Sequence, residues 1–177
     1  LTYHTPKMPF IKIHNNEQGK NYFSDLSSVI EQMKPVYDAV NTVQRTPWRV
    51  NKAVLEIFET IWERDLLVAN LPAREEIPKI PSPLAKDVKT DELSAADKER
   101  FMKWKHKEKE RHQANIKLKS KRVMTEKLRS IAKQFSKFEA IYFPHTLDFR
   151  GRLYPAPMYL NPQGTSLAKG LLEFSEG

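Results

Sequence analysis

The chain is 177 residues long and basic, with a net charge of +8 at pH 7, and it contains no cysteine. The missing cysteines exclude disulfides, thiolate zinc sites and cysteine nucleophiles. No run of about 18 apolar residues predicts a membrane span, and no charged-then-apolar leader predicts a secretory signal. We therefore expect a soluble protein, and because the chain starts at Leu1 and not at Met, we expect it to be a piece of a longer one.

The positive charge is concentrated in one stretch. Residues 101–137 contain thirteen Lys and Arg against three Glu, so the rest of the chain is slightly acidic. A basic stretch of this kind favours a polyanionic partner such as nucleic acid. A surface that only confers solubility, or one that binds an acidic protein, remains an alternative.

The first 45 residues predict small packing elements. Residues 1–22 indicate a loop with at most one short strand and a turn. Ser24 is a candidate cap for a short helix that ends before Pro35, and Pro35 suits the first turn of a second helix through Gln44.

The next stretch predicts a helix that begins at Thr46-Pro47, because a capping residue precedes a proline there. Apolar residues then recur at spacings of four, three and four, which predicts one buried stripe: Val50, Val54, Ile57 and Ile61. Residues 71–83 contain four prolines and predict a semi-rigid connector without helix.

A long helix is predicted after the connector. Ser94 to Asp97 resembles a capping box, and neither Pro nor Gly occurs from there to Phe138. A helix of roughly 45 residues would be about 65 Å long. Its second half carries a packing seam that predicts an antiparallel hairpin with the preceding helix: Met124, Leu128, Ile131, Phe135 and Phe138.

Basic side chains continue the seam toward the start of the long helix. Lys117 and Lys121 fall on the same stripe, with Lys119 and Arg122 beside it, so these four are candidates for contact with phosphates. The alternating lysines farther out, from Lys103 onward, predict a solvated helix.

The segment from residue 141 to 170 carries the most distinctive chemistry. If residues 148–154 form a strand, alternation places one polar set on one face: Asp148, Arg150, Arg152 and Tyr154. The other face then carries Phe149, Gly151 and Leu153. Two guanidiniums beside a glycine that permits close approach suit a phosphate chain. An edge strand with a solvated arginine pair is the alternative.

A turn and a short helix follow the arginines. Residues 161–164, Asn-Pro-Gln-Gly, have turn composition, and Thr165-Ser166 offers a cap for a helix that carries Lys169. We expect that helix to bring Lys169 toward the arginines.

An ordered series of motifs resembles the start of the palm in the single-subunit RNA polymerases of bacteriophages and mitochondria. The series is Phe143-Pro144, Asp148-Phe149-Arg150-Gly151-Arg152, Tyr154, Asn161-Pro162-Gln163-Gly164 and Lys169-Gly170. Upstream, Thr46-Pro47-Trp48-Arg49-Val50-Asn51 is similar to the start of the first long helix of the thumb, the domain that leans over the RNA·DNA hybrid in this family. Trp48 and Arg49 are possible contacts to upstream nucleic acid, although packing is the simpler expectation.

The resemblance implies a mostly α fold, in which an antiparallel long-helix hairpin, the thumb, precedes a short β/α segment that begins a right-hand polymerase palm. Residues 1–45 would end the promoter-binding domain, residues 46–138 would form the thumb around the 71–83 connector, and residues 139–177 would begin the palm. Arg150, Arg152 and Tyr154 would contact the template or hybrid. Lys169 would meet the RNA 3′ end or nucleotide phosphates, and Gln163 would line the same wall.

The resemblance further implies a DNA-directed RNA polymerase, a nucleotidyltransferase that uses a DNA template, an RNA·DNA hybrid and nucleoside triphosphates. Mg²⁺ would be held by carboxylates outside this piece. Asp148 is better explained as an ion-pair partner of the arginines, so we expect no catalytic or metal-binding residue here and no activity from the isolated piece. The other polymerase segments would be its protein partners.

Compact spacing favours a bacteriophage enzyme in the cytoplasm of an infected bacterium over one in the mitochondrial matrix. The rival interpretations are a non-enzymatic basic nucleic-acid-binding module and a helical-hairpin interaction protein.

Overall fold

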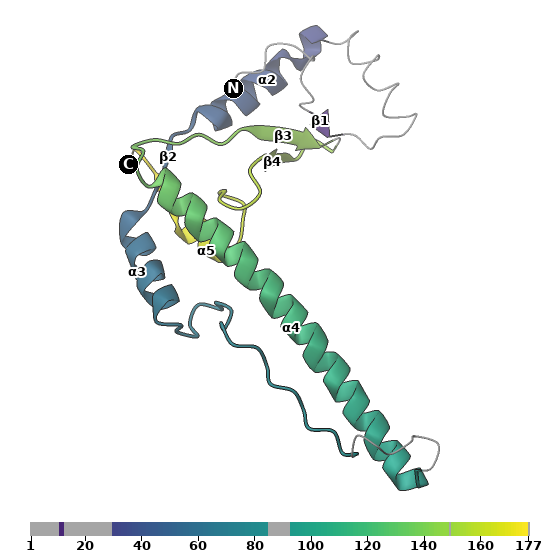
Figure 1. Ribbon diagram of the computed structural model, residues 1–177. Coiled ribbons are helices and arrows are strands. Elements are labelled where there is room, and N and C mark those ends of the chain that lie inside the picture. The colour runs from purple at the N-terminus through teal and green to yellow at the C-terminus, as the bar shows by residue number, and fades with distance from the viewer. Residues whose placement is uncertain (1–10, 13–29, 85–92, 149, 177) are drawn as a thin grey trace. The chain divides into compact units, whose positions relative to one another are not determined.

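A computed structural model describes residues 11–12, 30–84, 93–148 and 150–176 (Figure 1). These residues are predominantly helical, as expected, and they also form two small sheets. The chain forms two compact units: unit 1 comprises Leu1–Thr60 and Lys127–Gly177, and unit 2 comprises Ile61–Glu126. The sequence divided the chain at 45 and 138, and that functional division into thumb and palm stays a prediction.

A helix packed on a three-stranded sheet forms the first part of unit 1. The 3-10 helix η1 (Ile30–Met33) leads into α2 (Lys34–Arg45), with Pro35 in its first turn as predicted. Tyr37 and Val40 are buried and pack near Leu147 and Leu153. Those two residues belong to β3 (His145–Asp148) and β4 (Leu153–Pro155), an antiparallel pair, and β1 (Ile11–Lys12) adds in parallel beside β3. Ser24 lies outside the described residues.

The second sheet of unit 1 corrects the predicted helix start at Thr46-Pro47. Residues Trp48–Val50 form strand β2, which pairs antiparallel with β5 (Leu172–Phe174). Trp48 also exchanges backbone hydrogen bonds with Ile141, and its ring packs against Phe174 at 4.3 Å between centroids. Helix α3 (Lys52–Glu63) begins later, where the Asn51 side chain accepts the Val54 N–H.

The buried face of α3 is rotated from the predicted stripe. Leu55 and Phe58 are buried, whereas Ile57 is 60% exposed. The helix carries apolar residues on both faces, and the rest of unit 1 covers the face with Leu55 and Phe58 and not the face with Ile57. Glu59, on the same helix, binds Arg129 and Lys133 of α4 (Ala95–Phe135).

The predicted seam of the long helix is also partly wrong. Leu128 is buried as expected, but its buried companions are Thr125 and Ala132, and Met124, Phe135 and Phe138 are exposed. The Glu59 ion pairs hold the α4 face with Arg129 and Lys133 toward α3. Rotation about the helix axis is therefore set by charge pairing as well as by apolar burial.

Unit 2 contains most of α4 and the proline-rich connector. Ser94 caps α4 as predicted: its hydroxyl accepts the Asp97 N–H and donates to the Asp97 carboxylate. Residues 71–84 contain no helix or strand and are hydrogen-bonded to α4. We call them the strap. The predicted connector without helix is therefore confirmed, and the thumb hairpin expected between α3 and the second half of α4 stays a prediction.

Candidate nucleic-acid interface

The arginine motif forms the loop of the β3–β4 hairpin, which corrects the predicted continuous strand. Gly151 has φ +79°, a left-handed conformation that L side chains rarely adopt, and this reverses the chain between the two strands. Arg150 and Arg152 therefore lie in the loop and not on one strand face. Gly151 serves the turn, and a Cβ added there would meet no atom within 4 Å. Phe149 lies outside the described residues.

Asp148 organises this loop, which we call the arginine loop (residues 148–152). One carboxylate oxygen accepts the backbone N–H groups of Arg150 and Arg152 at 2.9 and 2.8 Å. The other oxygen accepts from the Arg150 guanidinium at 3.0 Å. This confirms the ion-pair role expected for Asp148, which the structure shows with Arg150.

The electrostatics of the loop follow from these contacts. Burial raises the pKa of the Asp148 carboxyl, but hydrogen bonds from the Arg152 and Arg150 N–H groups and the Arg150 guanidinium outweigh it, so the pKa lies below its ordinary value. The ionised carboxylate balances Arg150. The Arg152 side chain is exposed and makes no ion pair within the described residues, so the loop keeps a net positive charge at Arg152.

Tyr154 and Gln163 belong to connected elements. Tyr154 lies on β4 opposite Thr146 and is 38% exposed. The Gln163 side chain donates to the Leu153 carbonyl at 3.1 Å, which ties the turn at residues 161–164 to β4. Within that turn, buried Asn161 accepts the Gln163 N–H, as its predicted turn composition requires.

Lys169 lies on the predicted short helix, α5 (Ser166–Gly170). Thr165 caps this helix by accepting the Ala168 N–H, and the Lys169 side chain is exposed. Its expected approach to the arginines stays a prediction.

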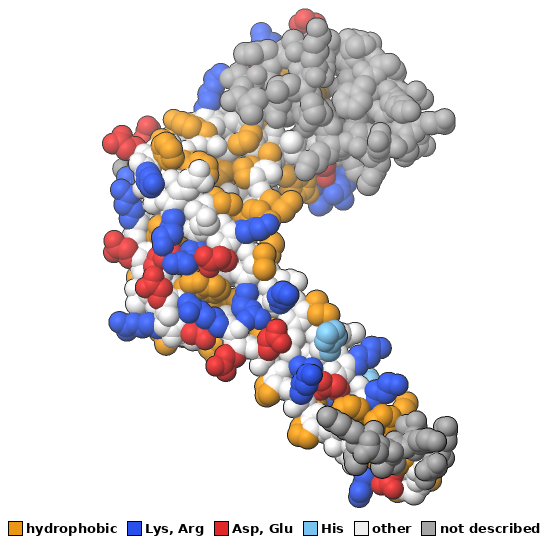
Figure 2. Space-filling view, in the orientation of Figure 1, with side chains coloured by type: hydrophobic (Ala, Val, Ile, Leu, Met, Phe, Trp, Pro, Cys, Tyr) orange, Lys and Arg blue, Asp and Glu red, His pale blue; other side chains and the backbone are white. Residues whose placement is uncertain are grey.

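Three of the four candidate cations on α4 are exposed. Two of the four donate hydrogen bonds to residues of the segment that precedes α4. Lys117 and Lys119 are exposed. Lys121 donates to the Asn70 side chain at 2.8 Å, and half-buried Arg122 donates to the Arg74 carbonyl. Figure 2 shows Lys and Arg side chains along the face that α4 forms, with acidic residues between them. Lys121 and Arg122 therefore have structural contacts, whereas Lys117 and Lys119 extend into solvent.

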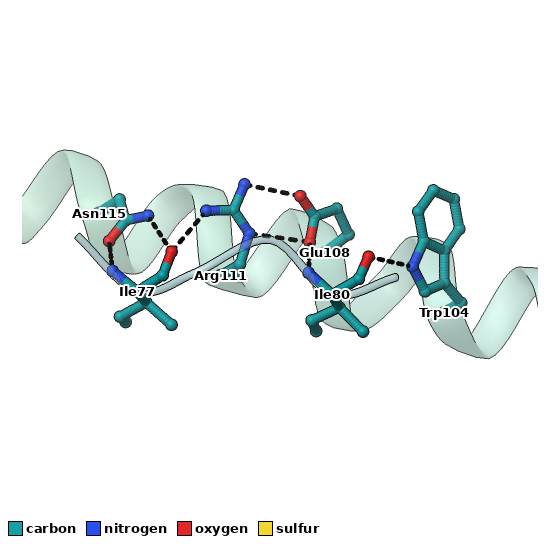
Figure 3. A network of polar contacts seen from close by, with 6 residues as sticks. All are labelled: Ile77, Ile80, Trp104, Glu108, Arg111 and Asn115. Atoms are coloured by element: carbon teal, nitrogen blue, oxygen red, sulfur yellow. Dashed lines mark hydrogen bonds and ion pairs between the residues drawn. The ribbon is translucent and has the colours of Figure 1, made fainter. Parts of the chain in front are cut away.

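Sequence reasoning missed the residues that hold the strap. Asn115 accepts the Ile77 N–H and donates to its carbonyl, at 2.9 and 3.0 Å, as a paired strand would (Figure 3). Glu108 accepts the Ile80 N–H, and Trp104 donates to the Ile80 carbonyl. Arg111 joins Glu108 to the Ile77 carbonyl. These four residues of α4 recur at spacings of four, three and four, which places them on one face of the helix: Trp104, Glu108, Arg111 and Asn115. That spacing could have identified them, but three of the four are polar, and only apolar residues at this spacing predict a packing stripe.

Within the described ranges, no three His, Cys, Asp or Glu side chains cluster closely enough to hold a metal ion. The same ranges contain no helix that combines the length and apolar character needed to cross a membrane.

The amino-acid sequence is similar to those of DNA-directed RNA polymerases of plants. Over 167 residues, 94% of the chain, it is 38% identical to DNA-directed RNA polymerase 2, chloroplastic/mitochondrial, of Arabidopsis thaliana. Over 147 residues it is 37% identical to DNA-directed RNA polymerase 1, mitochondrial, of the same plant, and 39% identical to DNA-directed RNA polymerase 3, chloroplastic, of Nicotiana sylvestris. The chain spans 14% to 15% of the length of these relatives. No protein-family model matches it.

Proposed function

We propose that this chain, which is homologous to one segment of the DNA-directed RNA polymerases of plant organelles, is part of a DNA-dependent RNA polymerase. The observation that carries the proposal is the identity of 38% along 94% of the chain. The complete protein would join nucleoside triphosphates into RNA on a DNA template. A non-enzymatic nucleic-acid-binding module is disfavoured because the relatives are named as polymerases.

Within that enzyme, we assign this segment to gripping the template and the RNA·DNA hybrid. Two separate groups of cations support the assignment. In unit 1, Arg152 is the uncompensated charge of the arginine loop, so we expect it to bind phosphate more strongly than Arg150, which Asp148 balances. In unit 2, Lys117 and Lys119 extend exposed from α4, the helix we propose as the core of the thumb.

Catalysis of nucleotidyl transfer is assigned to residues outside this segment. Two-metal transfer needs carboxylates with oxygens available to the ions. Both oxygens of Asp148 are engaged within its loop, and those of Glu173 accept from Arg49 and Asn51 at 2.6 Å each. These residues do not fit a Mg²⁺ site, so Mg²⁺, expected for the polymerase, would be held elsewhere in the protein.

The relatives also bear on where the protein works. Their names place them in chloroplasts or mitochondria, which agrees with the mitochondrial alternative and gives no support to a bacteriophage origin. We therefore propose an organellar enzyme.

Salt dependence of binding tests the gripping role. If about four phosphates are contacted, log affinity of the full-length polymerase for an RNA·DNA hybrid should fall against log salt with a slope near −3 to −4. Lys117→Gln combined with Lys119→Gln should reduce the magnitude of that slope, by about one for each phosphate contact that is lost. Both side chains are exposed, so folding should be unaffected.

The matched control is Lys98→Gln combined with Lys103→Gln, which removes the same charge from the start of the same helix. Lys103 is already paired with Glu99 at 2.6 Å. The control should leave the slope nearly unchanged. Equal slopes for all three proteins would contradict the assignment of Lys117 and Lys119 to the hybrid.

A further inference from the structure

An exposed aliphatic loop follows α3 in unit 2. Within residues 64–71, which we call the aliphatic loop, Leu66, Leu67 and Val68 are 44%, 71% and 46% exposed. Three adjacent large aliphatic side chains in water are unfavourable unless something covers them in the working protein.

The aliphatic loop is held in an unusual backbone conformation. Asp65, Ala69 and Asn70 have φ of +52°, +51° and +59°, a left-handed conformation that Asp and Asn tolerate but that is costly for Ala69. Such a conformation persists only where surrounding contacts impose it. Here the Leu66 N–H donates to the Ile61 carbonyl at 3.1 Å, and the Leu71 N–H donates to the Val68 carbonyl at 3.0 Å. The loop therefore presents its aliphatic side chains on a braced support.

Lys121 braces the same loop and Arg122 braces the adjoining strap, while Asp65, the acidic residue of the loop, lies 4.0 Å from Arg74. Lys121 donates to the Asn70 amide oxygen, and Arg122 donates to the Arg74 carbonyl; both acceptors carry no net charge. Arg74 donates to the Trp62 carbonyl and lies over the Trp62 ring, 5.7 Å from its centroid. The contact of Lys121 with Asn70 places positive charge directly beside the aliphatic residues.

We propose that the aliphatic loop packs against the terminal base pair of an RNA·DNA hybrid, with Lys121 and Arg122 close to the adjacent phosphates. The end of a duplex is where a flat apolar base surface lies next to anionic phosphates, and this matches the pairing of aliphatic and cationic groups in the loop. Aliphatic side chains contact base surfaces in architectural proteins, where they insert as wedges between base steps. The inference rests on the proposed function, since it requires that the polymerase hold a hybrid.

The positive charges of Lys121 and Arg122 favour a nucleic-acid end over a protein segment as the ligand of the loop. A segment of another protein that covered only the aliphatic residues would leave Lys121 and Arg122 uncompensated, whereas a duplex end meets both requirements with one ligand. A braced loop also suits a rigid flat surface, because little ordering entropy remains to be lost on contact.

The test uses the full-length polymerase bound to an RNA·DNA scaffold with 2-aminopurine at the template base of the hybrid end farthest from the RNA 3′ end. Leu67→Ser removes the most exposed aliphatic side chain. Met102→Ser is the matched control, because Met102 is 62% exposed on α4 of the same unit. Leu67→Ser should lower the equilibrium constant for packing of the loop on the terminal base pair roughly fivefold, because covering about half of a Leu side chain changes an equilibrium constant by about that factor. The readout is the change in 2-aminopurine fluorescence on binding. Met102→Ser should behave as wild type.

The other possible outcomes separate failure of the loop inference from failure of the proposed gripping role. If Leu67→Ser and Met102→Ser give the same fluorescence as wild type while Lys117→Gln with Lys119→Gln still lowers the salt slope, the loop inference fails and the proposed function stands. If Leu67→Ser leaves the fluorescence unchanged but lowers the melting temperature of the polymerase, another protein segment covers the loop. If the salt slope does not respond either, the proposed gripping role of Lys117 and Lys119 is contradicted as well.

Discussion

Replacing Gly151 by Ala tests whether the arginine loop needs its left-handed turn. At φ +79° an added Cβ meets no neighbour within 4 Å, so the cost is conformational and not steric. Placing an L residue in this region costs roughly 1–2 kcal/mol. We expect Gly151→Ala to lower the free energy of unfolding by about that amount if the loop keeps its shape.

The alternative response of the loop is also measurable. If the loop relaxes to an ordinary φ instead, the N–H groups of Arg150 and Arg152 leave the Asp148 carboxylate, and Arg152 loses its position. Stability then changes less, and affinity for an RNA·DNA hybrid falls. Urea unfolding and hybrid titration of the same variant therefore distinguish strain from rearrangement.

Gly170→Ala is the matched control for this experiment. Its Cβ also meets no atom within 4 Å, and Gly170 has no left-handed φ. Removing backbone freedom from the unfolded chain should make this variant neutral or more stable by about 0.5–1 kcal/mol. The reasoning is refuted if Gly151→Ala matches Gly170→Ala in stability and matches wild type in hybrid affinity.

Two further predictions concern helix packing and catalysis. Hydrogen bonding to Arg129 outweighs burial and lowers the pKa of Glu59. A lowered folded-state pKa means stability that is present above the ordinary Glu range and lost as pH falls through and below it. Glu59→Gln should therefore lower the free energy of unfolding in urea by about 1–3 kcal/mol at neutral pH and by little in acid. The control Glu56→Gln, at an exposed position of α3, should be neutral at both pH values. Equal losses for Glu59→Gln at both pH values would contradict the charge argument. Separately, the isolated 177-residue chain should not extend a labelled RNA primer with Mg²⁺ present, and extension that Asp148→Asn abolishes would place the catalytic carboxylate in the arginine loop.

The sequence determined the features whose signals are local. Caps act within one turn of a helix, so Ser94 and Thr165 could be recognised from their own neighbours, as could Pro35 in the first turn of α2. The turn at Asn161 follows from an amide that binds the backbone two residues later. The motif series around the arginine loop indicated the polymerase relationship that the comparisons support.

Only the tertiary structure decided which faces and segments meet. Residues 48–50 form a strand because residues 172–174, more than 120 positions away, supply their hydrogen bonds, and no local pattern reports that pairing. The buried faces of α3 and α4 follow the Glu59 ion pairs as well as apolar periodicity. The strap is held by Asn115 and its neighbours on α4, whose polar side chains replace the backbone pairing that an extended segment lacks. These choices depend on partners distant in sequence, and the free energy of such contacts exists only after the chain has brought them together.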